Sequence, residues 1–217
     1  SDTEHEFAHN KRKLGKSWEY FDKKVEYHFN ELGFRNKPFD QVNWKKSVVI
    51  IGCSIVEGVG LAEEDTIGKK LEEILNIPVV NLGVGGSGAD VASWNSLILH
   101  EHYPHPSAIV QLWSGLDRYN ISKQGQHNLQ QASKSTYVDL NWERRSKFYI
   151  ESDRALWKNK TIYHESSFFD HTAIQMNIEH FNSTSLARDL QHPGSNDTCI
   201  IARLLADRLM EKGLTRQ

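Results

Sequence analysis

The hydrophobic pattern divides the chain into short apolar runs and longer segments in which apolar residues recur every three or four positions. Three runs, 48–51, 78–82 and 108–113, are too short for most helices and are rich in β-branched residues. Runs of this kind, bounded by glycine or turn residues, are typical of strands buried in a parallel sheet. They predict three strands whose two faces are both covered.

Between these runs, apolar residues recur every three or four positions, which predicts helices. Asp65 or Thr66 is a candidate N-cap for a helix that ends near Leu75, and a second helix is predicted over 89–100. A long amphipathic helix over about 197–212, capped by Ser195 or Asn196, closes the chain. The alternation of strand and helix indicates βαβ units and a doubly wound parallel sheet.

The remaining segments give a weaker pattern. Residues 1–16 form a charged arm that we expect to be poorly ordered, and Ser17 is a candidate cap for an accessory helix over 17–32. A polar excursion over 119–140 is followed by a helix over 142–157 and a short strand at 161–163. We therefore divide the chain into 1–46, the arm and accessory helix, and 47–217, a domain with an insertion at about 119–186.

Composition narrows the class of protein. The 217 residues suit one domain, and 38% hydrophobic with 25% charged residues is ordinary for a soluble globular protein. A formal net charge of −2 predicts no nucleic-acid partner, and no apolar run approaches the roughly 20 residues that span a membrane. Two cysteines make no disulfide framework. With no visible signal peptide, a cytoplasmic location is favoured, although a processed chain would also lack one.

Candidate chemistry gathers where the first two strands end. Ser54 follows the first strand closely, and the glycine-rich turn 83–88 follows the second. Open parallel sheets bind ligands at the carboxyl ends of their strands. A hydroxyl beside free backbone amides at such a position suits acyl transfer. Asp189 and His192 lie three residues apart before the final helix, so they could serve as orienter and general base for Ser54. Among 11 histidines and 28 acidic residues, this spacing alone is a weak signal.

Taken together, three blocks resemble the SGNH hydrolase superfamily of GDSL-type esterases and lipases. They are Gly52-Cys53-Ser54, the run from Asn81 to Gly86, and Asp189-Leu190-Gln191-His192-Pro193. The resemblance implies a three-layer α/β/α sandwich with a flavodoxin-like parallel sheet. It also implies a catalytic triad of Ser54, Asp189 and His192, and an oxyanion hole built from the backbone amides of Ser54 and Gly86. It implies no metal and no organic cofactor.

Two positions depart from the family pattern. Leu116 stands where the family has an asparagine that donates to the oxyanion, and losing one such donor typically costs about 2.7–4 kcal/mol of transition-state stabilisation. Asn120 and Arg118 are the nearby candidates to substitute for it. Cys53 replaces an aspartate, and we expect this small thiol to pack into the fold.

The resemblance favours a serine ester hydrolase that removes a short, acetyl-like acyl group from a carbohydrate or small molecule. Two alternatives stay open. One is a degenerate domain that binds a glycan or a protein without hydrolysing anything, and the other is an O-acyltransferase on the same scaffold. The expected partner is the ester substrate, with no nucleic acid and no membrane. Whether the chain forms a homo-oligomer stays open.

Overall fold

The centre of the molecule is a five-stranded parallel sheet. The computed structural model describes residues 2–118 and 136–215, with side chains left undescribed over 136–142. The strands lie in the order β2-β1-β3-β4-β5. Their bounds are β1 Val48–Gly52, β2 Val79–Gly83, β3 Ala108–Trp113, β4 Ile162–Ser167 and β5 Glu179–His180. All four pairings are parallel, which confirms the predicted doubly wound sheet.

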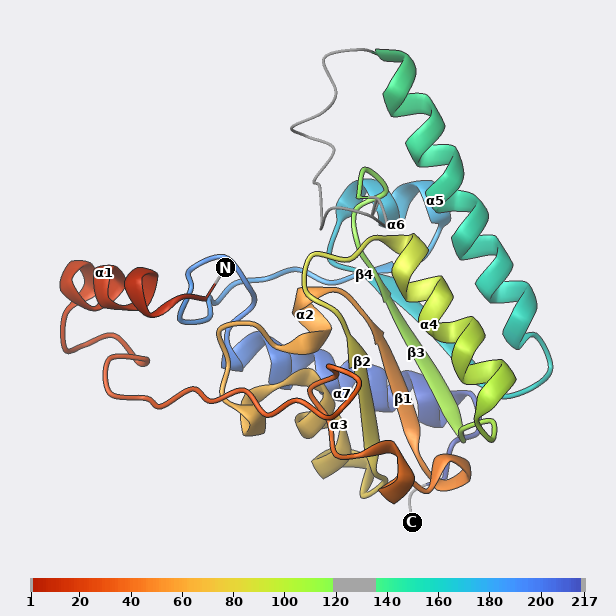
Figure 1. The fold of residues 1–217 in the computed structure, drawn as a ribbon, viewed down its shortest axis with the longest axis horizontal. Helices are drawn as coiled ribbons and strands as arrows, with labels where there is room; N and C mark the ends of the chain where they lie inside the picture. The colour runs from red at the N-terminus through yellow and green to blue at the C-terminus, as the bar shows by residue number, and fades with distance from the viewer. Residues whose placement is uncertain (1, 119–135, 216–217) are drawn as a thin grey trace.

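Helices cover both faces of the sheet (Figure 1). One face carries α3 (Ile67–Leu75) and α7 (Ser195–Glu211), and the other carries α4 (Ala89–His102) and α5 (Thr136–Trp157). Side chains of β1 alternate between them, since Val48 and Ile50 join the α3–α7 core while Val49 and Ile51 join the α4–α5 core. The predicted three-layer sandwich is therefore confirmed.

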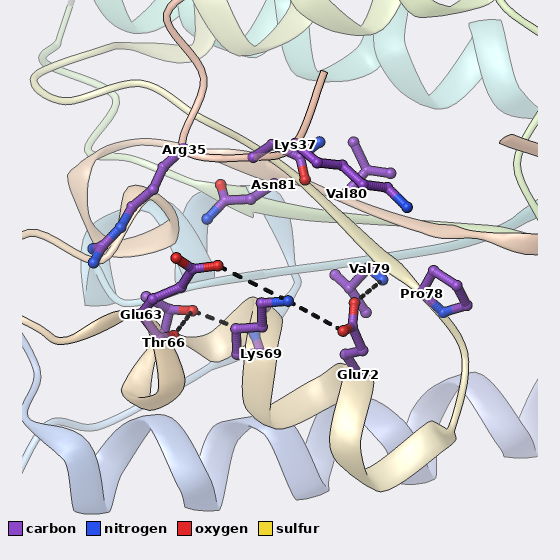
Figure 2. Close-up of a pocket in the computed structure, with 12 residues that line it drawn as sticks. Arg35, Lys37, Glu63, Thr66, Lys69, Glu72, Pro78, Val79, Val80 and Asn81 are labelled. Carbon is purple, nitrogen blue, oxygen red and sulfur yellow. Dashed lines mark hydrogen bonds and ion pairs between the residues drawn. The ribbon is translucent and has the colours of Figure 1, made fainter. Parts of the chain in front are cut away.

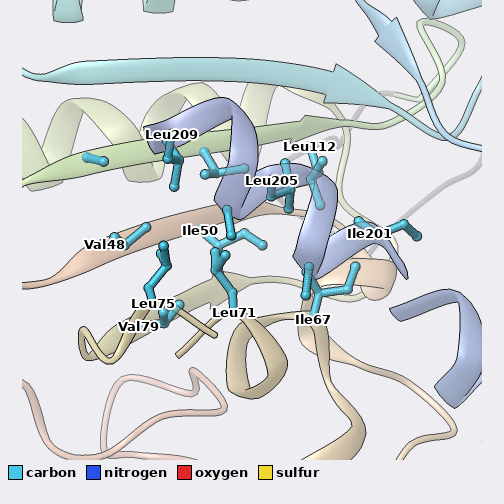
Figure 3. Packing of buried hydrophobic residues seen from close by; sticks show 14 of the residues in the cluster. Val48, Ile50, Ile67, Leu71, Leu75, Val79, Leu112, Ile201, Leu205 and Leu209 are labelled. Atoms are coloured by element: carbon cyan, nitrogen blue, oxygen red, sulfur yellow. The ribbon is translucent and has the colours of Figure 1, made fainter. Parts of the chain in front are cut away.

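The α3–α7 core explains why these two helices lie together (Figure 3). On α7, Ile201, Leu205 and Leu209 recur every four residues and are all at least 98% buried. They meet Leu71 and Leu75 of α3 above the sheet. Burying one such side chain is worth roughly 1.5–3 kcal/mol, so this interface fixes α7 and the loop that precedes it.

Shorter elements occupy the connections. They are α2 (Ser54–Glu57), α6 (Asp170–Met176) and the 3-10 turns Phe39–Gln41, Trp44–Lys46 and Glu63–Asp65. The range predicted as an insertion supplies α5, β4, α6 and β5, and β4 pairs with β3 along its whole length, so this part is integral to the sheet. In the described ranges no helix is both long and apolar enough to cross a bilayer.

The N-terminal region differs from the prediction. The helix is α1, Glu4–Leu14, where Thr3 and Glu6 form a capping box and Gly15 ends the helix. The prediction of a helix over 17–32 is wrong, because that stretch is turns and extended chain. The apolar spacing of this stretch does not reflect burial: Phe29 and Leu32 are 49% and 57% exposed, although a packed helix would bury them. Tertiary contacts of the segment decide its conformation instead of its helical propensity.

Candidate active site

The turn between β1 and α2 places Ser54 at the carboxyl edge of the sheet. The chain passes very close to β3 here, since a Cβ on Gly52 would lie 2.6 Å from the carbonyl oxygen of Leu112. Only glycine fits such an approach. Ser54 is the first residue of α2, so its backbone N–H has no partner within the helix.

The loop before α7 is held in shape by its own hydrogen bonds. Ala187 N–H donates to the His192 carbonyl at 2.8 Å, and Leu190 adopts a left-handed conformation with φ 58°. Asp189 Oδ1 accepts the backbone N–H groups of Gln191 at 3.1 Å and His192 at 3.2 Å. These bonds fix the orientation of the Asp189 carboxylate and leave its other oxygen facing the imidazole.

The structure brings Ser54, His192 and Asp189 together in one hydrogen-bonded row. His192 Nε2 lies 2.7 Å from Ser54 Oγ, across 138 positions of sequence, and His192 Nδ1 lies 2.6 Å from Asp189 Oδ2. The Asp189 side chain is fully buried and that of His192 is 17% exposed. Burial opposes ionisation of Asp189, but the bonds from His192 and the two backbone amides outweigh it, so the pKa of the carboxyl is lowered. Asp189 is therefore a carboxylate at neutral pH.

The glycine-rich turn lies directly beside the start of α2. Ser87 N–H donates to the Val84 carbonyl at 3.2 Å, and Gly86 has φ 72°, so glycine suits this turn position. Val84 N–H and the Ser87 hydroxyl both donate to the Gly52 carbonyl, at 3.0 and 3.3 Å. The turn that carries Gly86 is thus tied to the backbone two residues before Ser54.

Glu57 is a neighbour of this turn that the sequence analysis missed. Its carboxylate accepts the Gly85 N–H, and a Cβ on Gly85 would lie 2.8 Å from Glu57 Oε2. Burial raises the pKa of Glu57, while Gly85, Arg35 and His192 act in the opposite direction. The available signal was its position three residues after Ser54 on the same helical turn, which places both side chains on one side of α2.

The two departures from the family pattern are both buried. Leu116 is 3% exposed and packs in the α4–α5 core, and Cys53, also 3% exposed, is a free thiol, so the expected packing of Cys53 is confirmed. The Arg118 guanidinium lies 5.0 Å from the centre of the Phe169 ring. Asn120, the other candidate substitute donor, falls outside the described residues.

A separate cavity of about 210 Å³ lies along the outer edge of β2, between that strand and the start of α3 (Figure 2). None of the three predicted triad residues lines it. Lys69 pairs there with Glu63 at 3.9 Å and Glu72 at 3.2 Å, and Glu72 also accepts the Val79 N–H at 2.8 Å. Lys69, Glu63 and Glu72 thus satisfy one another's charges in this cavity.

The described part of the chain has no group of three His, Cys, Asp or Glu side chains placed to hold a metal ion. The reactive groups that the structure brings together are the hydroxyl of Ser54, the imidazole of His192 and the carboxylate of Asp189, with backbone amides alongside.

Comparison with known proteins identifies the fold. No protein-family profile matches the chain, and no curated sequence matches it. A solved structure of a protein assigned to the lipolytic G-D-S-L family, from Desulfitobacterium hafniense DCB-2, is similar with a TM-score of 0.52 and 13% identity, over 76% of this chain and 99% of that one. The acetyl xylan esterase Est2A from the rumen bacterium Butyrivibrio proteoclasticus gives 0.52 and 14%, over 79% of this chain and 64% of that one. At these identities the similarity establishes the fold, and the predicted SGNH-type architecture is confirmed.

Proposed function

We propose that this chain, which has the SGNH-type fold, is a serine hydrolase that cleaves an ester through Ser54, His192 and Asp189. The observation that carries the proposal is the row of two short hydrogen bonds, 2.7 Å from His192 Nε2 to Ser54 Oγ and 2.6 Å from His192 Nδ1 to Asp189 Oδ2. A nucleophile, a base and an orienter in this order are the working parts of a catalytic triad, whatever the fold that carries them.

In the proposed reaction, Ser54 Oγ attacks the ester carbonyl carbon while His192 Nε2 takes its proton. Asp189 keeps the other ring proton on Nδ1 and stabilises the imidazolium that forms. The carbon–oxygen bond to the leaving alkoxide then breaks, and His192 returns the proton to that oxygen. Water repeats the sequence on the acyl-enzyme, releasing the acid and restoring Ser54.

The backbone amides of Ser54 and Gly86 are the proposed donors to the negatively charged oxygen of the intermediate. In support, the Ser54 N–H has no partner within α2, and the turn of Gly86 is hydrogen-bonded to Gly52. Leu116 supplies no donor from its side chain. The proposed hole is thus made of main-chain groups, which need no rearrangement during the reaction.

We further propose a short acyl group on a carbohydrate or a small molecule as the substrate. One similar structure is an acetyl xylan esterase, which agrees with a small acyl group. The polar composition of 119–140, rich in Gln, Asn and Ser, also favours a polar alcohol part over a long-chain lipid.

Turnover of p-nitrophenyl acetate tests the proposal directly. The wild-type chain should hydrolyse it, and Ser54→Ala should lose this activity while keeping the wild-type unfolding temperature. The adjacent Cys53→Ala variant is the matched control, because it changes a buried neighbour that makes no part of the row and should keep most of the activity. Equal turnover by wild type and Ser54→Ala would refute the proposal.

A second candidate function is binding of a glycan or protein without hydrolysis. Leu116 favours it, because a buried leucine stands where the family has an oxyanion donor. A fluorophosphonate probe separates the two candidates, since it labels an activated serine whatever the natural substrate. Labelling that depends on Ser54 and His192 supports the hydrolase, and an unlabelled folded protein supports the binding domain. An acyltransferase would also be labelled, and product analysis with sugar acceptors distinguishes it.

A further inference from the structure

Arg188, the residue before Asp189, is held by side chains from the start of the chain. Its Nε donates to both carboxylate oxygens of Asp2, at 2.7 and 2.8 Å, and the two side chains are only 5% and 3% exposed. The guanidinium also lies 4.7 Å from the centre of the Phe7 ring. The Asn10 amide donates to the Arg188 carbonyl at 3.0 Å, so the backbone is held as well as the side chain.

The same region reaches the loop that follows α2. The Tyr27 hydroxyl donates to Asp2 and accepts the Gly60 N–H at 2.7 Å, while Arg188 N–H donates to the Gly60 carbonyl at 3.2 Å. Gly60 has φ 81°, and a Cβ there would lie 3.2 Å from Asp189 Oδ1. The N-terminal region, the loop after α2 and the loop of Asp189 therefore meet here, and Gly60 lies next to the Asp189 carboxylate.

A small apolar core joins these three segments. Tyr20, Leu61 and Ala187 are buried together, with Phe7 and Trp18 packed against them, and this cluster is separate from the two cores of the sheet. Tyr20 comes from the N-terminal region, Leu61 from the loop after α2 and Ala187 from the loop of Asp189. The N-terminal region thus supplies three of the five side chains of this cluster, Phe7, Trp18 and Tyr20.

We infer that residues 2–10, the N-terminal brace, position the Asp189–His192 loop against Ser54. Asp2 and Arg188 do not touch the reacting atoms, so they are positioning residues. Because Arg188 and Asp189 are consecutive, a shift of one moves the other, and a misplacement of about 1 Å in a catalytic group can lower the rate roughly 100-fold. The catalytic part of this inference rests on the proposed function.

Asp2→Asn in the full chain tests the brace, with Asp22→Asn as the matched control. Asp22→Asn makes the same chemical change at a side chain that is 89% exposed. The Asp22 carboxylate lies 3.9 Å from the Lys11 ammonium. We expect Asp2→Asn to lower kcat by roughly 10- to 100-fold at a temperature where both variants are folded, with a much smaller change in KM. Hydrogen exchange of the 186–194 backbone should be faster in Asp2→Asn, and Asp22→Asn should match wild type in both measurements.

Further variants keep the test decisive if Asp2→Asn does not fold. Asn10→Leu removes the hydrogen bond to the Arg188 carbonyl, so it should lower kcat and speed hydrogen exchange at 186–194, each by less than Asp2→Asn does. Asp2→Glu keeps a carboxylate and should have a kcat between those of Asp2→Asn and wild type. A lower unfolding temperature with unchanged kcat and unchanged exchange at 186–194 would overturn the inference, since it would show a purely stabilising role. If the wild type hydrolyses no ester, the proposed function fails, and the exchange measurement alone still decides whether the brace holds the loop.

Discussion

Replacing Asp189 by asparagine tests the proposed triad with almost no change in side-chain size. Oδ1 of Asp189 accepts two backbone N–H groups, so the amide oxygen of the variant should stay there. The amide nitrogen then takes the place of Oδ2, 2.6 Å from His192 Nδ1. Because it donates, Nδ1 must accept, and the neutral imidazole carries its proton on Nε2.

This tautomer cannot act as a base toward Ser54. The Nε2–H would donate to the Ser54 hydroxyl, whereas catalysis needs Nε2 to accept its proton. For a triad with this geometry, the wrong tautomer lowers kcat by about 10⁴, which corresponds to about 5.4 kcal/mol at 1.36 kcal/mol per decade. We therefore expect Asp189→Asn to lower kcat for p-nitrophenyl acetate by about this factor, with little change in KM.

Asp197→Asn is the matched control. Asp197 also orders a neighbouring loop, accepting from the side chains of Ser183 and Thr184 and from the backbone N–H groups of Thr184 and Ser185, all at 2.8 Å. It does not contact His192, so its variant should lose stability but keep kcat within a few-fold. If Asp189→Asn kept more than about a tenth of the wild-type kcat, the assignment of Asp189 as orienter would be refuted.

Three further predictions follow from single residues. Glu57→Gln keeps the shape but removes the charge that accepts the Gly85 N–H, so the free energy of unfolding should fall by ~1 kcal/mol, the difference between charged and neutral acceptors; urea unfolding that matches wild type would contradict it. Burial raises the pKa of Asp153 to about 6, and because the unfolded carboxyl ionises near 4, the contribution of Asp153 to stability should fall by about 3 kcal/mol as the pH rises from about 4 to above 6. The difference in unfolding free energy between wild type and Asp153→Asn, measured with urea, should therefore change by this amount between pH 4 and pH 8, and an unchanged difference would argue against a buried carboxyl as the source. Leu116→Asn should lower the free energy of unfolding by about 2–4 kcal/mol without raising kcat, because it puts an amide among buried apolar side chains; a tenfold gain in kcat would instead show that position 116 reaches the oxyanion.

The strands and most of their helices were predictable because local sequence and tertiary burial agree there. The run 108–113 is β3 without adjustment, and Thr66, one of the two predicted caps, is the cap of α3, since its hydroxyl accepts the Lys69 N–H. Short runs of apolar β-branched residues suit a parallel strand that is covered on both faces. The last helix follows in the same way from the four-residue spacing of buried Ile201, Leu205 and Leu209.

The N-terminal region was not predictable from local pattern. Residues 17–32 carry helical spacing, but Tyr20 and Tyr27 donate or accept across the fold, and Lys23 forms an ion pair with Asp65. A pattern of apolar residues cannot report partners that are distant in sequence. The pair of Asp2 and Arg188, 186 positions apart, left no local signal for the same reason.

The hydrogen-bonded row also has a consequence for biosynthesis. Its hydroxyl is synthesised 138 residues before its imidazole, since Ser54 and His192 are that far apart in sequence. Contacts of such long range form late, after the ends of a large loop have been brought together. A growing polypeptide would therefore carry Ser54 without its imidazole partner until His192 has been synthesised and the last helix docks.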